Sequence, residues 1–341
     1  MKFLIIRFSS IGDMVLTTPI IRCIKEQIPN AEIHFLCKEK YKDILAANPH
    51  ISKFYYLQYD LQPVMLELLK EKYDYIIDLH KNIRTRYVKG ILKQAFNSQV
   101  ISFQFNKLHV QKFLYTKFHL NFLPDKSIVD RYFEGIKKLN IKNDGKGLDF
   151  YIANDQKIKD SDLPMSHSQG FVACGIGGQH ETKKMPLDKW QALLSKIPYP
   201  VILLGGQEDK AQAEQMASID PIRIYNACGK FSLAESADIV QHAKMVISHD
   251  TAIMHIAAAF KKKIIAIWGN TAPPLGMFPY YGHNNYKSHP SPMSYFAEVP
   301  QLKCHPCSKI GYKKCPKGHF KCMKNQNIDL IAAKVLEMWK D

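Results

Sequence analysis

The stretch KFLIIRFSSIGD, residues 2–13, decides the fold class of this sequence. A short, β-rich apolar run at Lys2–Arg7 leads into a turn containing Ser10, and a helical pattern then extends from about Gly12 to Gln27. Strand and helix patterns keep alternating along the rest of the chain. Such alternation is typical of parallel βαβ units, so the sequence predicts an α/β protein.

The alternation can be followed at nearly every element except in residues 100–126, where no clear pattern emerges. Strands are expected at Lys2–Arg7, Glu32–Cys37, Lys53–Leu57, Tyr73–Leu79, Phe171–Ile176, Val201–Leu204, Ile222–Tyr225, Met245–Ser248 and Lys263–Trp268. Helices of the second half are expected at Leu187–Lys196, Asp209–Ala217, Ser232–His242, Ala252–Ala259 and from about Ile328 to Lys340. The polar stretch Asn154–Gln169 is the expected linker.

The chain is long enough for two domains. Its 341 residues suggest an N-terminal domain at 1–155, a C-terminal domain at 170–326 with a Cys-rich segment at 299–326, and a final helix at 327–341. Two open α/β sheets of this kind bind ligands at the carboxyl ends of their strands, and we expect one cleft between them. No apolar run approaches the ~20 residues of a membrane span, and Arg7 interrupts the first apolar run, so a cytoplasmic protein is expected.

The positive charge is confined to two segments. The net charge is +16, and residues 79–124 contribute eight basic residues and no acidic one. Residues 299–328 contribute seven lysines and no acidic residue. A charge placed in this way points to an anionic partner, such as nucleic acid, a phosphorylated small molecule or an anionic membrane surface.

Several turns after predicted strands carry candidate site residues. Asp13 follows the first strand, either as a carboxylate base or as an acid that complements a helix dipole. The backbone N–H groups of Ser9, Ser10 and Gly12 suggest an anion site. Asp250 and Thr251 precede an Ala-rich helix whose first N–H groups suit a phosphate.

Further candidates lie on other turns that follow predicted strands, and each also has a purely structural interpretation. His255 falls one turn into the Ala-rich helix and is either a site residue or a buried structural histidine. Lys183 follows a glycine-rich turn and is either a diphosphate ligand or a solvated lysine. Glu208 follows a Gly-Gly pair and suits a ribose hydroxyl, although the glycines equally suit a tight turn.

Taken together, the motifs FLIIRFSSIGDMVLTTP, KKMP, GGQED, SHDTAIMHIAAA and WGNTAP resemble those of the lipopolysaccharide heptosyltransferase family, glycosyltransferase family 9. The resemblance covers nearly the whole chain. It implies the GT-B fold of two Rossmann-like domains, with the acceptor on the first and the nucleotide sugar on the second. It also implies a metal-independent, inverting transfer of heptose from ADP-heptose to inner-core lipopolysaccharide, with no cofactor required.

The resemblance assigns roles residue by residue. Asp13 matches the catalytic base and Lys183 the lysine that contacts the donor phosphate. The implied donor-binding residues are Ser10, Gly12, Glu208, Asp250, Thr251, Ala252 and His255. Ala252 stands where the family usually has Gly, and Asn270 stands where it usually has Pro. In the first basic segment, Lys81, Arg84 and Arg86 are the expected acceptor-binding residues, for phosphates or carboxylates of the glycan, with a solvated basic helix face as the alternative.

The cysteines divide into two groups. Cys23, Cys37, Cys174 and Cys228 lie in apolar surroundings and are expected to be buried and reduced. Cys304, Cys307, Cys315 and Cys322 have ligand types and spacing that fit a structural zinc site, but reduced thiols packing a loop and a disulfide remain alternatives.

The expected partners are a nucleotide-sugar donor, an anionic lipid-linked glycan acceptor and, through the second basic segment, the cytoplasmic face of the inner membrane. Nucleic acid is not among them, because no aromatic stacking motif accompanies the charge. Two rival functions stay open from the residues: a nucleotide-sugar epimerase of the same architecture, and a basic nucleic-acid-binding protein with a zinc ribbon.

Overall fold

The computed structural model describes residues 1–340 and divides into two compact units. Unit 1 comprises Met1–Lys107 and Ile128–Tyr151, and unit 2 comprises Leu108–Ser127 and the chain from Ile152 onward. Residues 108–127 therefore group with unit 2, although they interrupt unit 1 in the sequence. The final residue of the expected helix at 327–341 lies outside the described residues.

Unit 1 is built on a parallel sheet of five strands in the order β3-β2-β1-β4-β5. The strands are β1 (Lys2–Ile6), β2 (Glu32–Lys38), β3 (Lys53–Leu57), β4 (Tyr75–Asp78) and β5 (Ile101–Gln104). Strand β1 lies in the middle of the sheet. Phe3, Leu4, Ile5 and Ile6 are fully buried, as expected for a strand that is covered on both faces. The first four strands confirm the prediction, and β5 lies in the stretch that showed no clear pattern.

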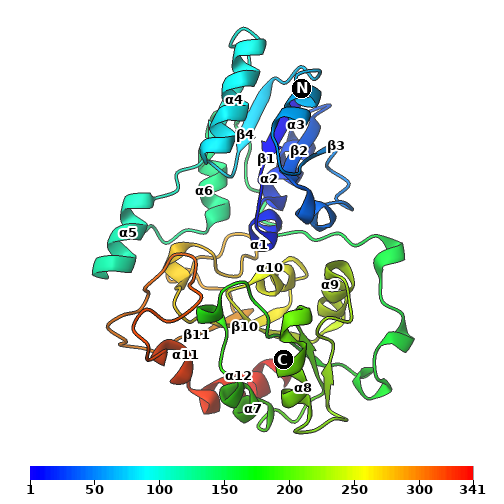
Figure 1. Ribbon diagram of the computed structural model, residues 1–341, viewed down its shortest axis with the longest axis vertical. Helices are drawn as coiled ribbons and strands as arrows, with labels where there is room; N and C mark the ends of the chain where they lie inside the picture. Colours follow the sequence, from blue (N-terminus) through cyan, green and yellow to red (C-terminus); the bar gives the residue numbers. More distant parts are fainter. Residues whose placement is uncertain (341) are drawn as a thin grey trace. The chain divides into compact units, whose positions relative to one another are not determined.

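Helices α2, α3 and α4 lie alongside this sheet (Figure 1). The helices of unit 1 are α1 (Ile11–Val15), α2 (Thr18–Gln27), α3 (Gln62–Leu68), α4 (Ile83–Ala95) and α6 (Ile128–Gly135). The single helix expected from Gly12 to Gln27 is wrong, because the chain breaks between α1 and α2. Pro19 has no N–H to continue a helix and suits a first turn, and the hydroxyl groups of Thr17 and Thr18 donate to the last carbonyls of α1.

Unit 2 contains a second parallel sheet, of six strands in the order β11-β10-β9-β6-β7-β8. The strands are β6 (Val172–Gly175), β7 (Val201–Leu204), β8 (Ile224–Asn226), β9 (Met245–His249), β10 (Lys263–Ile267) and β11 (Ser294–Ala297). The helices are α5 (His109–Phe118), α7 (Leu187–Leu194), α8 (Lys210–Ala217), α9 (Leu233–His242), α10 (Ala252–Ala259), α11 (Lys321–Lys324) and α12 (Ile328–Lys340). Five of these strands confirm the prediction, whereas β11 was not expected.

The expected linker and the final helix both pack against unit 2. In the stretch expected to be the linker, the backbone N–H of Ile158 donates to Asp238, and the buried His167 ring contacts the carbonyl of Val201 at 3.1 Å. The final helix α12 buries Val335 in the core of unit 2, so this helix belongs to that unit. No helix within residues 1–340 is long and apolar enough to cross a membrane.

Candidate functional site

Two sets of candidate residues lie at the carboxyl ends of parallel strands, one set in each unit. In unit 1 the chain leaves β1 through Arg7 and reaches Asp13 in the short helix α1. In unit 2 the loops that follow β10, β9, β6 and β7 come from four consecutive strands of the sheet. Open α/β sheets bind ligands at this edge, because the loops after the strands are there free to vary.

Asp13 is held by an arginine that the sequence prediction missed. The Asp13 Oδ1 atom lies 2.5 Å from Nη2 of Arg7, while Oδ2 accepts from the Ser10 backbone N–H at 3.1 Å and from its hydroxyl at 2.9 Å. Arg7 also donates to the carbonyls of Ser9 and Leu79. The signal was present in the sequence, since Arg7 is a charged side chain at the end of an otherwise apolar strand.

These contacts keep Asp13 ionised. Burial by itself raises the pKa of Asp13, but the Arg7 charge and the Ser10 hydrogen bonds outweigh it, and the net pKa lies below the ordinary 3.8. A carboxylate has about four lone-pair positions, and Arg7 and Ser10 occupy three of them. The remaining position on Oδ1 belongs to a side chain that is 20% exposed, so it is available to a ligand hydroxyl.

Within the turn predicted to bind an anion, the Ser10 N–H is already engaged by Asp13. Helix α1 has only five residues, and the Ser10 N–H that was expected to meet an anion donates to Asp13 instead. The residues of this turn therefore position the carboxylate.

The depressed pKa predicts the acid limb of the pH–rate profile. If Asp13 must be ionised for turnover, kcat/KM will stay flat as pH falls until it approaches the lowered pKa, below 3.8. In Arg7→Gln the charge that lowers the pKa of Asp13 is removed, while burial still raises this pKa. The acid limb will therefore move to higher pH. Arg7→Lys keeps a charge and will shift it less.

The matched control is Lys138→Gln, which removes an exposed cation from the same unit and will leave the limb in place. Folding of both Arg7 variants is checked by thermal unfolding before kinetics. An unchanged acid limb in a folded Arg7→Gln variant would contradict the role given to Arg7.

The expected acceptor-binding residues differ in their surroundings. Lys81 Nζ donates to the Phe105 carbonyl at 3.2 Å, which ties this lysine to its own unit. Arg84 and Arg86 are exposed on α4. Of the three, Arg84 lines an open groove of about 610 Å³, together with exposed side chains that include Tyr59.

In unit 2 the strand-end loops are joined through charged side chains. Lys183 Nζ, after β6, lies 2.7 Å from Oδ2 of Asp250 and 3.0 Å from its carbonyl oxygen, after β9. Thr271, after β10, donates its hydroxyl to the same Oδ2 at 2.8 Å. The structure therefore brings Lys183, Asp250 and Thr271 together at these strand ends.

The neighbouring Lys184 has different partners. Its Nζ lies 3.0 Å from both Asp209 Oδ1, after β7, and Glu181 Oε1. Nearby, the Met185 N–H donates to Nε2 of His249, whose pKa burial lowers to about 3, so that this ring is a neutral acceptor. These bonds fix the backbone of the loop that carries Lys183.

The other donor-side candidates surround the same strand ends. Thr251 is the N-cap residue of α10, and its hydroxyl lies 3.2 Å from that of Ser248. Ala252 is half-buried in the first turn of α10, and His255 is buried one turn further. Glu208 is exposed beside Gly206.

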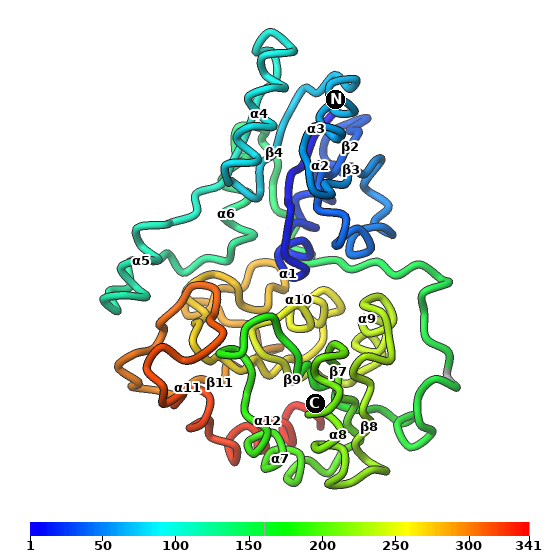
Figure 2. Tube along the Cα trace, in the orientation of Figure 1, coloured from blue at the N-terminus to red at the C-terminus, as the bar shows by residue number. Residues whose placement is uncertain are grey.

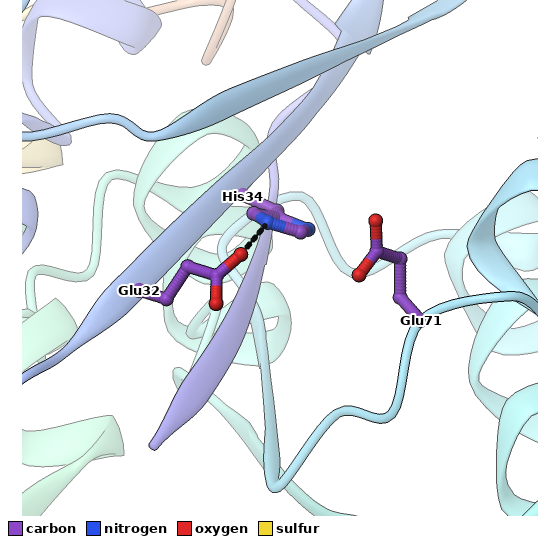
Figure 3. Close-up of side chains that lie close together, drawn as sticks. All are labelled: Glu32, His34 and Glu71. Carbon is purple, nitrogen blue, oxygen red and sulfur yellow. Dashed lines mark hydrogen bonds and ion pairs between the residues drawn. The ribbon is translucent and has the colours of Figure 1, made fainter.

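A third cluster, Glu32, His34 and Glu71, has the ligand types of a metal centre (Figure 3). The lysines that contact it argue against that role. Lys2 Nζ lies 2.5 Å from Glu71 Oε2 and 3.3 Å from Glu32 Oε1, and Lys53 contacts Glu71 as well. Hydrogen bonds from Lys2 and Lys53 lower the pKa of Glu71 to about 2. This cluster lies at the amino ends of the strands and is a satisfied ion-pair network.

Comparison with known proteins identifies the family of this chain. Residues 64–289 match glycosyltransferase family 9 (heptosyltransferase). The chain belongs to this family, and it is a glycosyltransferase. This membership replaces the epimerase and nucleic-acid-binding alternatives.

Individual relatives agree with the family. The chain is 27% identical over 300 residues to lipopolysaccharide heptosyltransferase 1 of Campylobacter coli, covering 80% of this chain and 84% of the relative. Among solved structures, a family 9 glycosyl transferase from Veillonella parvula superposes with a TM-score of 0.73 at 19% identity, covering 100% of this chain and 98% of that one. The E. coli heptosyltransferase WaaC with ADP gives 0.70 at 18% identity, covering 99% and 100%. The predicted GT-B fold, with two parallel α/β sheets, is confirmed.

Proposed function

We propose that this glycosyltransferase moves a heptose from ADP-heptose to an inner-core lipopolysaccharide acceptor, with inversion and with Asp13 as general base. Membership of family 9 and relatives named as lipopolysaccharide heptosyltransferases support the substrate class. The observation that carries the mechanism is an anchored, ionised and partly exposed Asp13 at the carboxyl end of a central strand. No metal takes part in the proposed chemistry.

Inversion requires attack on the anomeric carbon from the side opposite the leaving ADP. The acceptor hydroxyl would donate to the remaining lone-pair position on Asp13 Oδ1 and give up its proton as its oxygen forms the new glycosidic bond. Arg7 restrains the carboxylate and keeps it charged before the reaction. A positioned base of this kind contributes about 10²–10⁴-fold to the rate.

On the donor side, Lys183 replaces the metal ion that other transferases use for the diphosphate. Its ammonium has three N–H donors, and Asp250 takes two of them through Oδ2 and the carbonyl oxygen. The third would bind the diphosphate, assisted by the N–H groups of Thr251 and Ala252 at the start of α10. Together they would stabilise the charge on the departing ADP.

The proposal gives the remaining candidates supporting roles. Glu208 would accept from the ribose hydroxyls, and His255 would shape the wall behind the diphosphate. Ser10 would position Asp13 rather than meet the donor, with Gly12 next to it allowing the sugar to approach. In unit 1, Arg84 and Arg86 would receive acidic groups of the acceptor, and Lys81 would shape the same edge.

The donor assignment is tested by binding. Isothermal titration and thermal-shift measurements with ADP, UDP and GDP, each alone and as nucleotide sugars, should show the largest stabilisation with ADP and ADP-heptose, because a ligand that binds only the folded state stabilises it by mass action. A preference for UDP or GDP would overturn the assignment. Adding Mg²⁺ or Mn²⁺ to the buffer should leave the ADP affinity unchanged.

We also propose that residues 108–122 contact an anionic membrane. Helix α5 has no buried residue, and Phe113, Phe118 and Phe122 are 53%, 60% and 65% exposed. Exposed aromatic side chains next to basic ones, here Lys117, are typical of a helix that lies in the membrane interface. Residues 299–328 expose Ile310 (54%) and Tyr312 (36%) beside their lysines, but the three exposed phenylalanines all lie within residues 113–122. Helix α5 and the residues after it are therefore the better candidate than the segment expected from charge alone.

Co-sedimentation with vesicles tests this surface. Binding to vesicles containing phosphatidylglycerol should exceed binding to neutral vesicles, and Phe113→Ser/Phe118→Ser should weaken it at least fivefold without changing thermal stability. Leu66→Ser removes an exposed apolar side chain from unit 1 and serves as the matched control. Equal binding of the wild type and the double variant would contradict the proposal.

A further inference from the structure

The Cys-rich segment gathers its four cysteines around one small cavity. Residues 299–320 contain neither helix nor strand and form an irregular loop that leads from β11 into α11 (Figure 2). A cavity of about 10 Å³ lies inside this loop. Its lining includes all four cysteines of the segment and two histidines: Cys304, Cys307, Cys315, Cys322, His305 and His319.

The four thiols and the His319 ring line the same cavity. Cys304 Sγ lies 3.7 Å from Nε2 of His319. Within residues 1–340, no three of these ligand atoms lie within 4.8 Å of one another, so coordination at ~2.3 Å requires the thiols to turn inward.

A second observation at the cavity is an unpartnered polar side chain. Asn270 lines the same cavity, is only 2% exposed, and has no hydrogen-bond partner for its side-chain nitrogen or oxygen. Buried amides are nearly always paired, so this side chain has a donor and an acceptor available for a group bound at the cavity. Thiolates bound to a metal ion are strong acceptors, and an amide N–H beside them is a typical outer partner.

The charge of the segment also fits such a ligand. Four thiolates around a divalent ion leave a net charge of about −2, which needs cations nearby. Residues 299–328 contain seven lysines and no acidic residue, and Lys317 of this segment lines the cavity. A negatively charged metal site would therefore give the lysines of this segment an anionic partner within the same chain.

We propose that Cys304, Cys307, Cys315 and Cys322 bind one tetrahedral metal ion, Zn²⁺ or iron, through four sulfur atoms. On binding, each thiol loses its proton to solvent and forms one metal–sulfur bond. Tetrahedral four-sulfur sites suit both ions, and the spacing of two close cysteines followed by two more is typical of structural zinc sites. The site is structural and lies outside the proposed chemistry.

The proposed ion would stabilise the loop of unit 2 that carries Asn270 and Thr271, an effect called the brace below. The N–H groups of Cys307 and Ser308 donate to the Asn270 carbonyl at 3.1 and 3.2 Å, and the His305 ring donates to the Thr271 carbonyl at 2.8 Å. Thr271 in turn bonds Asp250, the partner of Lys183. This consequence rests on the proposed function; the metal site itself does not.

The first experiment measures metal content. Full-length protein, purified under reducing conditions with its affinity tag removed, is analysed by plasma mass spectrometry. About one equivalent of zinc or iron per chain is expected, and which metal is present identifies the ion. Cys315→Ser should fall below a quarter of an equivalent, whereas Cys37→Ala, at a buried cysteine in unit 1, should keep it.

Two further measurements cover variants that fail to fold. Metal-free wild type should take up one equivalent of Zn²⁺ and gain thermal stability, and denatured protein should show eight free thiols. Less than a tenth of an equivalent together with no uptake, or only six thiols because of a disulfide, would overturn the site.

The brace is tested by ADP binding to metal-loaded and metal-free protein. A loss of affinity of at least fivefold on metal removal is expected, and equal affinities would overturn the brace. A metal-loaded protein that binds no ADP would refute the proposed donor while the metal site stands. If the purified protein carries no metal, takes up none and still binds ADP, the metal site is refuted while the proposed donor stands.

Discussion

Asp13→Asn is expected to lower kcat about 10²–10⁴-fold, while the affinity for ADP stays within twofold of wild type. The amide keeps the size of the carboxylate but cannot accept the proton of the acceptor hydroxyl. It also loses the charge that Arg7 opposes. The loss should therefore appear in kcat, measured by release of ADP under saturating donor and acceptor, rather than in donor binding.

The same substitution leaves a buried guanidinium without its partner, so stability must be measured as well. Breaking a buried ion pair costs about 3–5 kcal/mol, and assays belong well below the unfolding midpoint of the variant. Asp74→Asn is the matched control, because Asp74 accepts from the Lys2 N–H at the amino end of the same sheet. A folded Asp13→Asn enzyme with near-normal kcat would remove Asp13 from the mechanism.

Lys183→Met is expected to reduce kcat about 10²–10³-fold, the size seen when one preorganised group facing developing charge is removed. Methionine retains the length of the side chain but not the ammonium that would meet the diphosphate. Asp250 would then face the donor with one cation fewer, so ADP affinity should also fall. Pre-steady-state measurement of ADP release separates the two effects.

The neighbouring lysine gives the control for this prediction. Lys184→Met removes the same charge one residue away, but the Lys184 ammonium is already bound to Glu181 and Asp209. We expect a loss of stability and less than a tenfold loss of kcat. Equal losses of kcat in both variants would mean that the general positive field, and not the position of Lys183, carries the effect.

Most of the fold could be predicted because hydrophobic patterning dominates buried parallel strands. The exception at residues 100–126 has a physical reason: β5 is an edge strand with no fully buried residue, and α5 buries none, so neither shows the usual pattern. The break between α1 and α2 depends on Pro19 and on the Thr17 hydroxyl, which donates to a carbonyl of α1. The apolar pattern continues through both helices and therefore did not reveal the break.

The candidate site could be predicted only in part. Sequence order points to Asp13, Lys183 and Asp250, because each follows a strand and carries charge. Their partners, Arg7 and Thr271, depend on how neighbouring strand ends meet, and a single sequence does not give that. The buried and unpaired state of Asn270 likewise appears only once β10 and the Cys-rich segment are folded together.

The central claim is tested most directly by incubating the purified enzyme with ADP-heptose and an inner-core lipopolysaccharide acceptor in a buffer without added divalent cations. Mass spectrometry should show addition of one heptose to the acceptor with release of one ADP, and NMR of the product should show inverted anomeric configuration. Absence of transfer from ADP-heptose while a UDP- or GDP-sugar is used, or retention of configuration, would contradict the account.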